Sequence, residues 1–146
     1  MVKKPLDDES RSEITKPAKP ESVAALIDFV ASYAQEMMFD DKRIAQVRLA
    51  LEETLGNIIR FACPAGNETI TMSCDAHEMG ALLLDIVDSG EPYNMLVIST
   101  FPEVAAHSDD PTCIPSTKAI KRYIKNIEYR RDGENRTNIL ACVISK

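Results

Sequence analysis

Residues 49–62 read LALEETLGNIIRFA, a stretch without proline that predicts the second half of a long helix. Glu53 and Asn57 lie one helical turn apart, so their side chains share a face and can point into one cleft. A magnesium ion takes one or two protein oxygens and completes its shell with water and substrate phosphates. The spacing therefore suits an amide oxygen on Mg²⁺ beside a carboxylate that is free to act as a base.

The same helix has a plainer interpretation as an amphipathic helix with a solvated side. Its apolar stripe consists of Ile44, Val47, Leu51, Leu55, Ile58 and Ala62. Glu53, Asn57 and Arg60 fall on the opposite side, where polar residues usually face water. Gly56 argues for a functional face, because a glycine inside a helix costs about 1 kcal/mol relative to alanine and tends to mark a close approach. Spacing alone leaves both interpretations open.

A second motif, Asp88-Ser89-Gly90, follows an apolar run at residues 81–87. The run predicts a central strand. Taken by itself, the motif after it is a turn at the end of a buried strand, since Asp, Ser and Gly all favour turns.

Together the two motifs resemble a known family. LALEETLGNIIRFA resembles the N-box of the Bergerat-fold ATPases, in particular of the bacterial anti-sigma-factor serine kinases, whose helix carries Glu-Ala-x-x-Asn. The resemblance extends, in the family's order, to ITKPAKPESVAALIDFV at residues 14–30, LLLDIVDSGEPYN at residues 82–94 and AIKRYIKNIEYRRDGENRTNILACVIS at residues 119–145. It therefore covers nearly all of the chain beyond the N-terminal tail.

The resemblance implies a nucleotide site that takes ATP and Mg²⁺. Asn57 corresponds to the magnesium ligand, and Glu53 to the carboxylate that orients or deprotonates a substrate hydroxyl. Asp88 would accept the adenine amino group, and Gly90 would let the backbone approach the purine. Two further residues, Pro92 and Tyr93, stand where the family has Pro-Phe.

The chain departs from the family at the phosphate loop. Its five glycines are residues 56, 66, 80, 90 and 133, so none lies between Glu91 and Asp132, where relatives carry Gly-x-Gly. Ile114 and Ser116 occupy those positions, and neither has the backbone freedom with which glycine wraps around phosphates.

Some phosphate affinity is still expected from the helix that follows. Ser116 or Thr117 is a good N-cap, and Lys118 adds positive charge near the helix N-terminus. The same basic residues also fit the solvated face of an amphipathic helix. We therefore expect nucleotide binding to be weakened or altered.

Composition limits the kind of partner. The chain has 146 residues and a formal net charge of −6, which disfavours a nucleic-acid partner and points to proteins or small molecules. Four dispersed cysteines without Cys-x-x-Cys spacing make a zinc site improbable. No apolar run suits a signal peptide or membrane helix, so we expect no membrane contact and a cytoplasmic location.

The expected architecture is an α+β two-layer sandwich of the Bergerat type, with three helices on one face of a mixed, mostly antiparallel sheet. Residues 1–15 are predicted to be a flexible tail with a possible first strand near Ser12 to Thr15, and residues 16–146 a single domain. The expected helices run from Pro20 past Met37, from Asp40 or Asp41 to about Ala62, and from Ser116 to about Lys125. The other expected strands are residues 69–75, 81–87, 127–131 and 138–144, and residues 99–115 are expected to form a mobile loop.

Three functions remain open. The first is an ATP-dependent protein serine/threonine kinase that phosphorylates a serine on a small regulatory partner. The second is a catalytically inactive module that binds a sigma factor or its antagonist, an anti-anti-sigma factor, with lost or weakened nucleotide binding. We place regulatory protein binding first, because it is compatible with either a functional or a lost ATP site. An unrelated role for the sandwich comes last. A homodimer through Tyr33, Met37, Met38 and Phe39 is an alternative to a core role for these residues.

Overall fold

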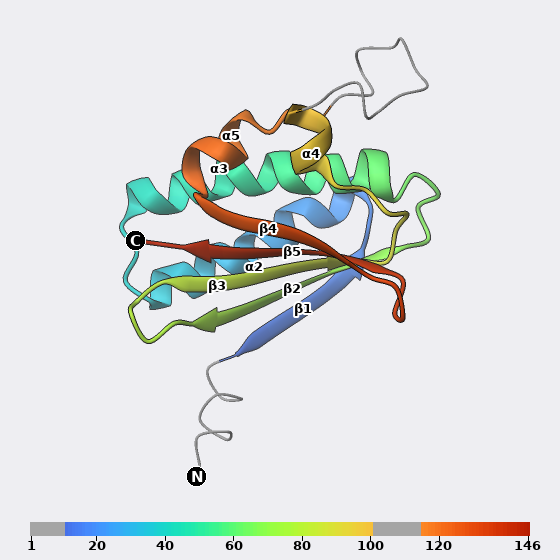
Figure 1. The fold of residues 1–146 in the computed structure, drawn as a ribbon. Coiled ribbons are helices and arrows are strands. Elements are labelled where there is room, and N and C mark those ends of the chain that lie inside the picture. Colours follow the sequence, from blue (N-terminus) through green and yellow to red (C-terminus); the bar gives the residue numbers. More distant parts are fainter. Residues whose placement is uncertain (1–10, 101–114) are drawn as a thin grey trace.

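The computed structural model describes residues 11–100 and 115–146, which form a sheet covered on one face by helices (Figure 1). Its strands are β1 (Ser12–Pro17), β2 (Thr69–Ala76), β3 (Leu82–Asp88), β4 (Asn126–Asp132) and β5 (Thr137–Ile144). They lie in the order β1-β2-β3-β5-β4. The predicted α+β sandwich is confirmed. Every pairing between described strands is antiparallel, so the parallel component of the expected mixed sheet is absent from them.

Two long helices cover the sheet. The chain passes through a short 3₁₀ turn, η1 (Pro20–Ser22), into α2 (Val23–Glu36), and then into α3 (Asp41–Asn57). Helix α3 begins where it was expected to, because the Asp40 carboxylate accepts a hydrogen bond of 2.7 Å from the Arg43 N–H. At its other end α3 continues into one stretch of π-helix, η2 (Ile58–Ala62).

Two short helices lie beyond α3 in Figure 1, α4 (Met95–Thr100) and α5 (Lys118–Tyr123). The third helix was expected, although α5 is shorter than predicted. Helix α4 was not expected, because six residues are too few for a hydrophobic period. Its start is nevertheless encoded locally: the Asn94 side chain accepts hydrogen bonds from the N–H groups of Leu96 and Val97, at 3.1 and 3.3 Å. Most of the loop expected at residues 99–115, and the tail at residues 1–10, lie outside the described residues.

The core fills the space between the sheet and the helices. Inward-facing side chains alternate along β3, where Leu82, Leu84 and Ile86 are buried, as a sheet covered on one face requires. Opposite them the expected apolar stripe of α3 is buried from Val47 to Ile58. Within the described residues, no helix combines the length and apolar character that crossing a bilayer needs.

The proposed dimer residues lie in three environments. Phe39 lies in the core, with 5% of its surface exposed, whereas Met38 is 80% exposed at the end of α2. Tyr33 and Met37 are partly buried against the core. Dimerisation through this surface stays a prediction.

Candidate functional site

On the polar face of α3, Asn57 is covered by other segments of the chain rather than by water. Asn57 is only 8% exposed, and its Nδ2 donates a hydrogen bond of 2.8 Å to the backbone carbonyl of Ser116. The same Nδ2 lies 3.6 Å from the sulfur of Met95, the first residue of α4. The interpretation of this face as a solvated surface is therefore wrong for Asn57.

Glu53 is also engaged, and both of its carboxylate oxygens accept hydrogen bonds. The Ser116 hydroxyl donates to Oε2 at 2.8 Å, and the Ile120 N–H donates to Oε1 at 3.0 Å. Ile120 is the third residue of α5, so its N–H is one of the groups that a helix cannot satisfy internally. Of the two predicted N-cap candidates, Ser116 and Thr117, Thr117 stands at the N-cap, but it makes no side-chain cap hydrogen bond. Glu53 provides the cap from α3 instead.

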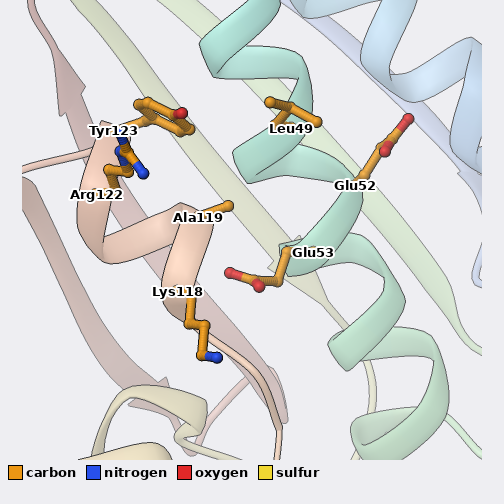
Figure 2. A pocket seen from close by; sticks show the side chains of 7 residues that line it. All are labelled: Leu49, Glu52, Glu53, Lys118, Ala119, Arg122 and Tyr123. Carbon is orange, nitrogen blue, oxygen red and sulfur yellow. The ribbon is translucent and has the colours of Figure 1, made fainter.

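A groove lies between α3 and α5, and Glu53 is one of the residues that line it (Figure 2). Its volume is about 590 Å³. Its walls are Leu49, Glu52 and Glu53 from α3 and Lys118, Ala119, Arg122 and Tyr123 from α5. Figure 2 shows the Glu53 carboxylate directed from α3 toward α5. The groove thus has acidic residues on its α3 side and basic residues on its α5 side, and Glu53 is the lining residue for which the resemblance implies a catalytic role.

Gly56 has no close neighbour in the described chain. A Cβ added there would meet no atom within 4 Å. The expectation that Gly56 marks a close approach of another backbone is therefore not met by the described residues, and the approach of a ligand stays a prediction.

The second motif lies at the end of β3, where Asp88 is 3% exposed. Its Oδ1 accepts hydrogen bonds from the Gly90 N–H at 2.9 Å, the Asn138 amide at 2.8 Å and the Cys63 thiol at 3.8 Å. No described residue donates to the other oxygen, Oδ2. Burial raises the pKa of Asp88 and outweighs the hydrogen bonds and the positive charge of Arg131, which lower it.

Gly90 is required by the protein itself. A Cβ at this position would lie 2.2 Å from the Ala62 carbonyl oxygen and 2.7 Å from the Cys63 sulfur. The carbonyl of Ala62 also accepts a hydrogen bond of 2.8 Å from the Glu91 N–H, which ties the end of the π-helix to the segment after β3. This contact alone explains the glycine, and an additional role in admitting a purine stays a prediction.

Asn138 on β5 forms hydrogen bonds with Asp88 and with the segment that follows β3, and it was not among the residues predicted from the sequence. It pairs with Asp88 across β3 and β5 and with Arg131 across β4 and β5, so the three form one polar row on the inner face of the sheet. Asn138 is 2% exposed. The sequence pattern of β5 could have indicated Asn138. It begins the inward-facing series that continues with Leu140, Cys142 and Ile144, and it is the polar member of that series.

The remaining predicted residues divide between the two ends. The Tyr93 ring stacks on Phe61 of η2, with centroids 5.4 Å apart and planes 16° apart, and its N–H donates to Asn138 Oδ1 at 3.2 Å. Pro92 is exposed beside it. At the other end Thr117 is buried and Lys118 is exposed. Ile114 lies outside the described residues.

The residues at the N-box end fit Mg²⁺ through one oxygen. The Nδ2 of Asn57 is committed to the Ser116 carbonyl, which leaves Oδ1 without a donor among the described residues. A single amide oxygen is enough for an ion that keeps most of its water and phosphate ligands. The two oxygens of Glu53 already accept hydrogen bonds and contribute nothing in this arrangement.

Comparison with known proteins agrees with this geometry. The family model described as the histidine kinase-like ATPase domain matches residues 16–142. No curated protein matches the chain at a significant level.

Proposed function

The chain belongs to the family of histidine kinase-like ATPase domains, and from that premise we propose that it is an ATP-binding regulatory protein that acts by binding a protein partner. The observation that carries the proposal is the contrast between Asp88 and Glu53. At Asp88 one oxygen receives no hydrogen bond from the described residues, while both oxygens of Glu53 and the Nδ2 of Asn57 are engaged by the chain itself. Base recognition thus has an acceptor without a described donor, whereas both oxygens of Glu53 are occupied and Asn57 keeps only its Oδ1.

Adenine fits the open oxygen of Asp88. A carboxylate can accept a hydrogen bond from an exocyclic amino group and cannot donate one to a carbonyl. The stacked pair of Phe61 and Tyr93 lies beside the same segment and adds aromatic surface. Asn57 would hold Mg²⁺ through Oδ1, and the ion would neutralise phosphate charge.

Phosphoryl transfer is the runner-up function. It is favoured by the groove of Figure 2, which gives a partner access to Glu53 from outside. It is disfavoured by Ser116, whose hydroxyl already lies on Glu53 where a substrate serine would have to bind. A kinase reaction on an antagonist would therefore begin with displacement of Ser116, after which Glu53 could orient the incoming hydroxyl.

The partner class is a sigma factor or its antagonist. The distribution of charge supports a protein-binding surface on α5: the chain carries a net charge of −6, yet Lys118, Lys121, Arg122 and Lys125 lie together at this helix. A basic patch on an acidic protein favours association with an acidic surface.

Calorimetric titration with ATP and Mg²⁺ tests the nucleotide part. We expect ATP binding in the native chain that Asp88→Asn weakens by about tenfold to a hundredfold and that Asn57→Ala changes little. Absence of heat and of any thermal shift would remove nucleotide binding from the proposal.

The partner part is tested separately, with candidate sigma factors and antagonists as purified proteins. We expect Arg122→Glu to weaken the complex. Arg11→Glu should leave it intact, because Arg11 is an exposed arginine directly before the edge strand β1. Incubation of each complex with ATP and Mg²⁺ followed by mass spectrometry separates the two functions, because a phosphorylated serine on the antagonist would establish the kinase.

A further inference from the structure

We propose that Asn138 is the positioning residue that sets base selectivity at Asp88, by saturating one carboxylate oxygen and leaving the other as a pure acceptor. The inference rests on the proposed nucleotide-binding function and concerns a residue of β5, far in sequence from both recognised motifs. Arg131 and Tyr129 of β4 act through Asn138 rather than on the ligand.

The amide of Asn138 uses its full hydrogen-bonding capacity. Its Nδ2 donates to Asp88 Oδ1 at 2.8 Å and to the Glu91 carbonyl at 2.7 Å. Its Oδ1 accepts from the Tyr129 hydroxyl at 2.6 Å, the Tyr93 N–H at 3.2 Å and Arg131 Nη1 at 3.3 Å. The NH₂ group of the amide therefore meets only acceptors, and its oxygen meets only donors.

This pattern fixes the orientation of the amide. A flipped Asn138 would place its oxygen against the carboxylate of Asp88 and the carbonyl of Glu91, and its NH₂ against two N–H donors. At a site where Asn138 is 2% exposed, water cannot compensate for those lost bonds. The donor face is thus held toward Asp88.

The segment after β3 is held by the same residues. Arg131 Nη1 donates to the Gly90 carbonyl at 2.9 Å, and Asn138 bonds the main chain at Glu91 and Tyr93. The backbone that borders Asp88 is therefore fixed on both sides of Gly90. Asp88 cannot turn its bonded oxygen outward without breaking this network.

The consequence is chemical selectivity. With Oδ1 occupied, the ligand meets only Oδ2, which accepts hydrogen bonds and donates none while Asp88 is ionised. A purine with a 6-amino group fits, and a purine with a 6-oxo group places oxygen against oxygen. Because the Asn138 hydrogen bond is the largest of the effects that lower the pKa of Asp88, its loss also favours the protonated acid, which can donate to a 6-oxo group.

The test compares ATP with ITP, which differ at the 6-position, by calorimetry on the native chain, Asn138→Ala and a matched control. The control is Asn126→Ala, an exposed asparagine on the edge strand β4. We expect the native chain and the control to prefer ATP. In Asn138→Ala we expect ATP affinity to fall about tenfold and ITP affinity to fall less, so that the preference shrinks. An equal loss for both nucleotides would assign Asn138 a purely structural role and overturn the inference.

Tyr129→Phe keeps the test decisive if Asn138→Ala does not fold. It removes only the hydroxyl that donates to Asn138 Oδ1, and we expect a smaller reduction of the same preference. An unchanged preference in this variant would contradict the role assigned to Asn138.

A second readout needs no nucleotide. Carbon NMR titration of the Asp88 carboxyl in the free chain should show a higher pKa in Asn138→Ala than in the native protein. Cys63, Tyr129 and Arg131 still face the group in both. An unchanged pKa would overturn the inference. If the native chain binds neither nucleotide, the proposed function fails, and the inference about selectivity fails with it even if the pKa moves.

Discussion

At the Asp88 end of the site one carboxylate oxygen is saturated and the other receives no described donor, whereas at the Glu53 end the chain itself occupies both carboxylate oxygens. Both carboxylates belong to motifs of the same family. Under the proposed function the Asp88 end would recognise the base, and the Glu53 end would lie at the phosphates.

The difference has a structural cause at each end. Asp88 lies in a row of the sheet, where Asn138 and Arg131 are placed by strand register. Glu53 lies on a helix against the start of α5, whose free N–H groups need acceptors. One oxygen of Asp88 is thus left without a described donor, whereas both oxygens of Glu53 accept hydrogen bonds from the segment that begins α5.

The largest expected effect concerns the contact that shapes the Asp88 end. Gly90→Ala places a methyl group 2.2 Å from the Ala62 carbonyl oxygen, so either β3 or the π-helix must shift. We expect a loss of about 3 kcal/mol in the free energy of unfolding, measured by urea denaturation. The matched control is Gly56→Ala, which meets no atom within 4 Å and should stabilise α3 by up to about 1 kcal/mol. Equal effects of the two substitutions would contradict the packing role of Gly90.

The second prediction separates stability from binding at Asp88. Asp88→Asn keeps an oxygen for the three donors on Oδ1 and removes a buried charge, so we expect stability to be retained or raised. It also turns the open acceptor into a donor, which should weaken ATP binding by about 1–3 kcal/mol, roughly tenfold to a hundredfold in Kd. Thermal unfolding and calorimetry measure the two effects. A variant that unfolds readily and still binds ATP would reverse the assignment.

The third prediction concerns Glu53 as a cap. Glu53→Ala leaves the Ile120 N–H and the Ser116 hydroxyl without their acceptor, so we expect a loss of about 1 kcal/mol in stability. Hydrogen exchange at the Ile120 amide should accelerate in this variant. Glu52→Ala is the control, since Glu52 is an exposed neighbour that lines the groove without a described hydrogen bond to α5. Unchanged exchange in Glu53→Ala would refute the cap.

The smallest expected effect is a pH dependence with opposite signs for stability and binding. Because the folded-state pKa of Asp88 is raised, its contribution to stability is fully present below the unfolded pKa and is lost as pH rises through the folded value. ATP binding needs the ionised acid, so affinity falls as pH is lowered through the same value. Thermal unfolding and titration at acidic and neutral pH measure both trends. Asp88→Asn should lack them, and a native chain in which stability and affinity rise together with pH would contradict the assignment.

Local patterns were sufficient to predict most of the fold. Apolar spacing located α2 and α3, alternation and turn residues located the two hairpins, and Asp40 marked the start of α3. The resemblance to a family then pointed to Glu53, Asn57 and Asp88. The structure places the first two on α3 beside α4 and α5, and Asp88 at the end of β3.

The contacts that give those residues their roles depend on distant parts of the chain. Asn138 meets Asp88 only through the register of β3 and β5, and Ser116 reaches Glu53 only once α5 lies against α3. The resemblance linked Gly90 to the ligand, but in the structure the nearest groups to this position are Ala62 and Cys63. This contact was not predicted, because residue spacing does not reveal the π-helix at the end of α3. Sequence patterns identify candidate groups, and tertiary contacts decide which of their atoms are available.

The most direct test of the contrast between the two ends is a calorimetric series with adenosine, AMP, ADP and ATP in the presence of Mg²⁺. We predict that adenosine binding accounts for most of the affinity, that each added phosphate contributes little, and that Asn57→Ala changes the series only slightly. An affinity that rises about tenfold or more with each phosphate and collapses in Asn57→Ala would show that the phosphate end is functional and would contradict this account.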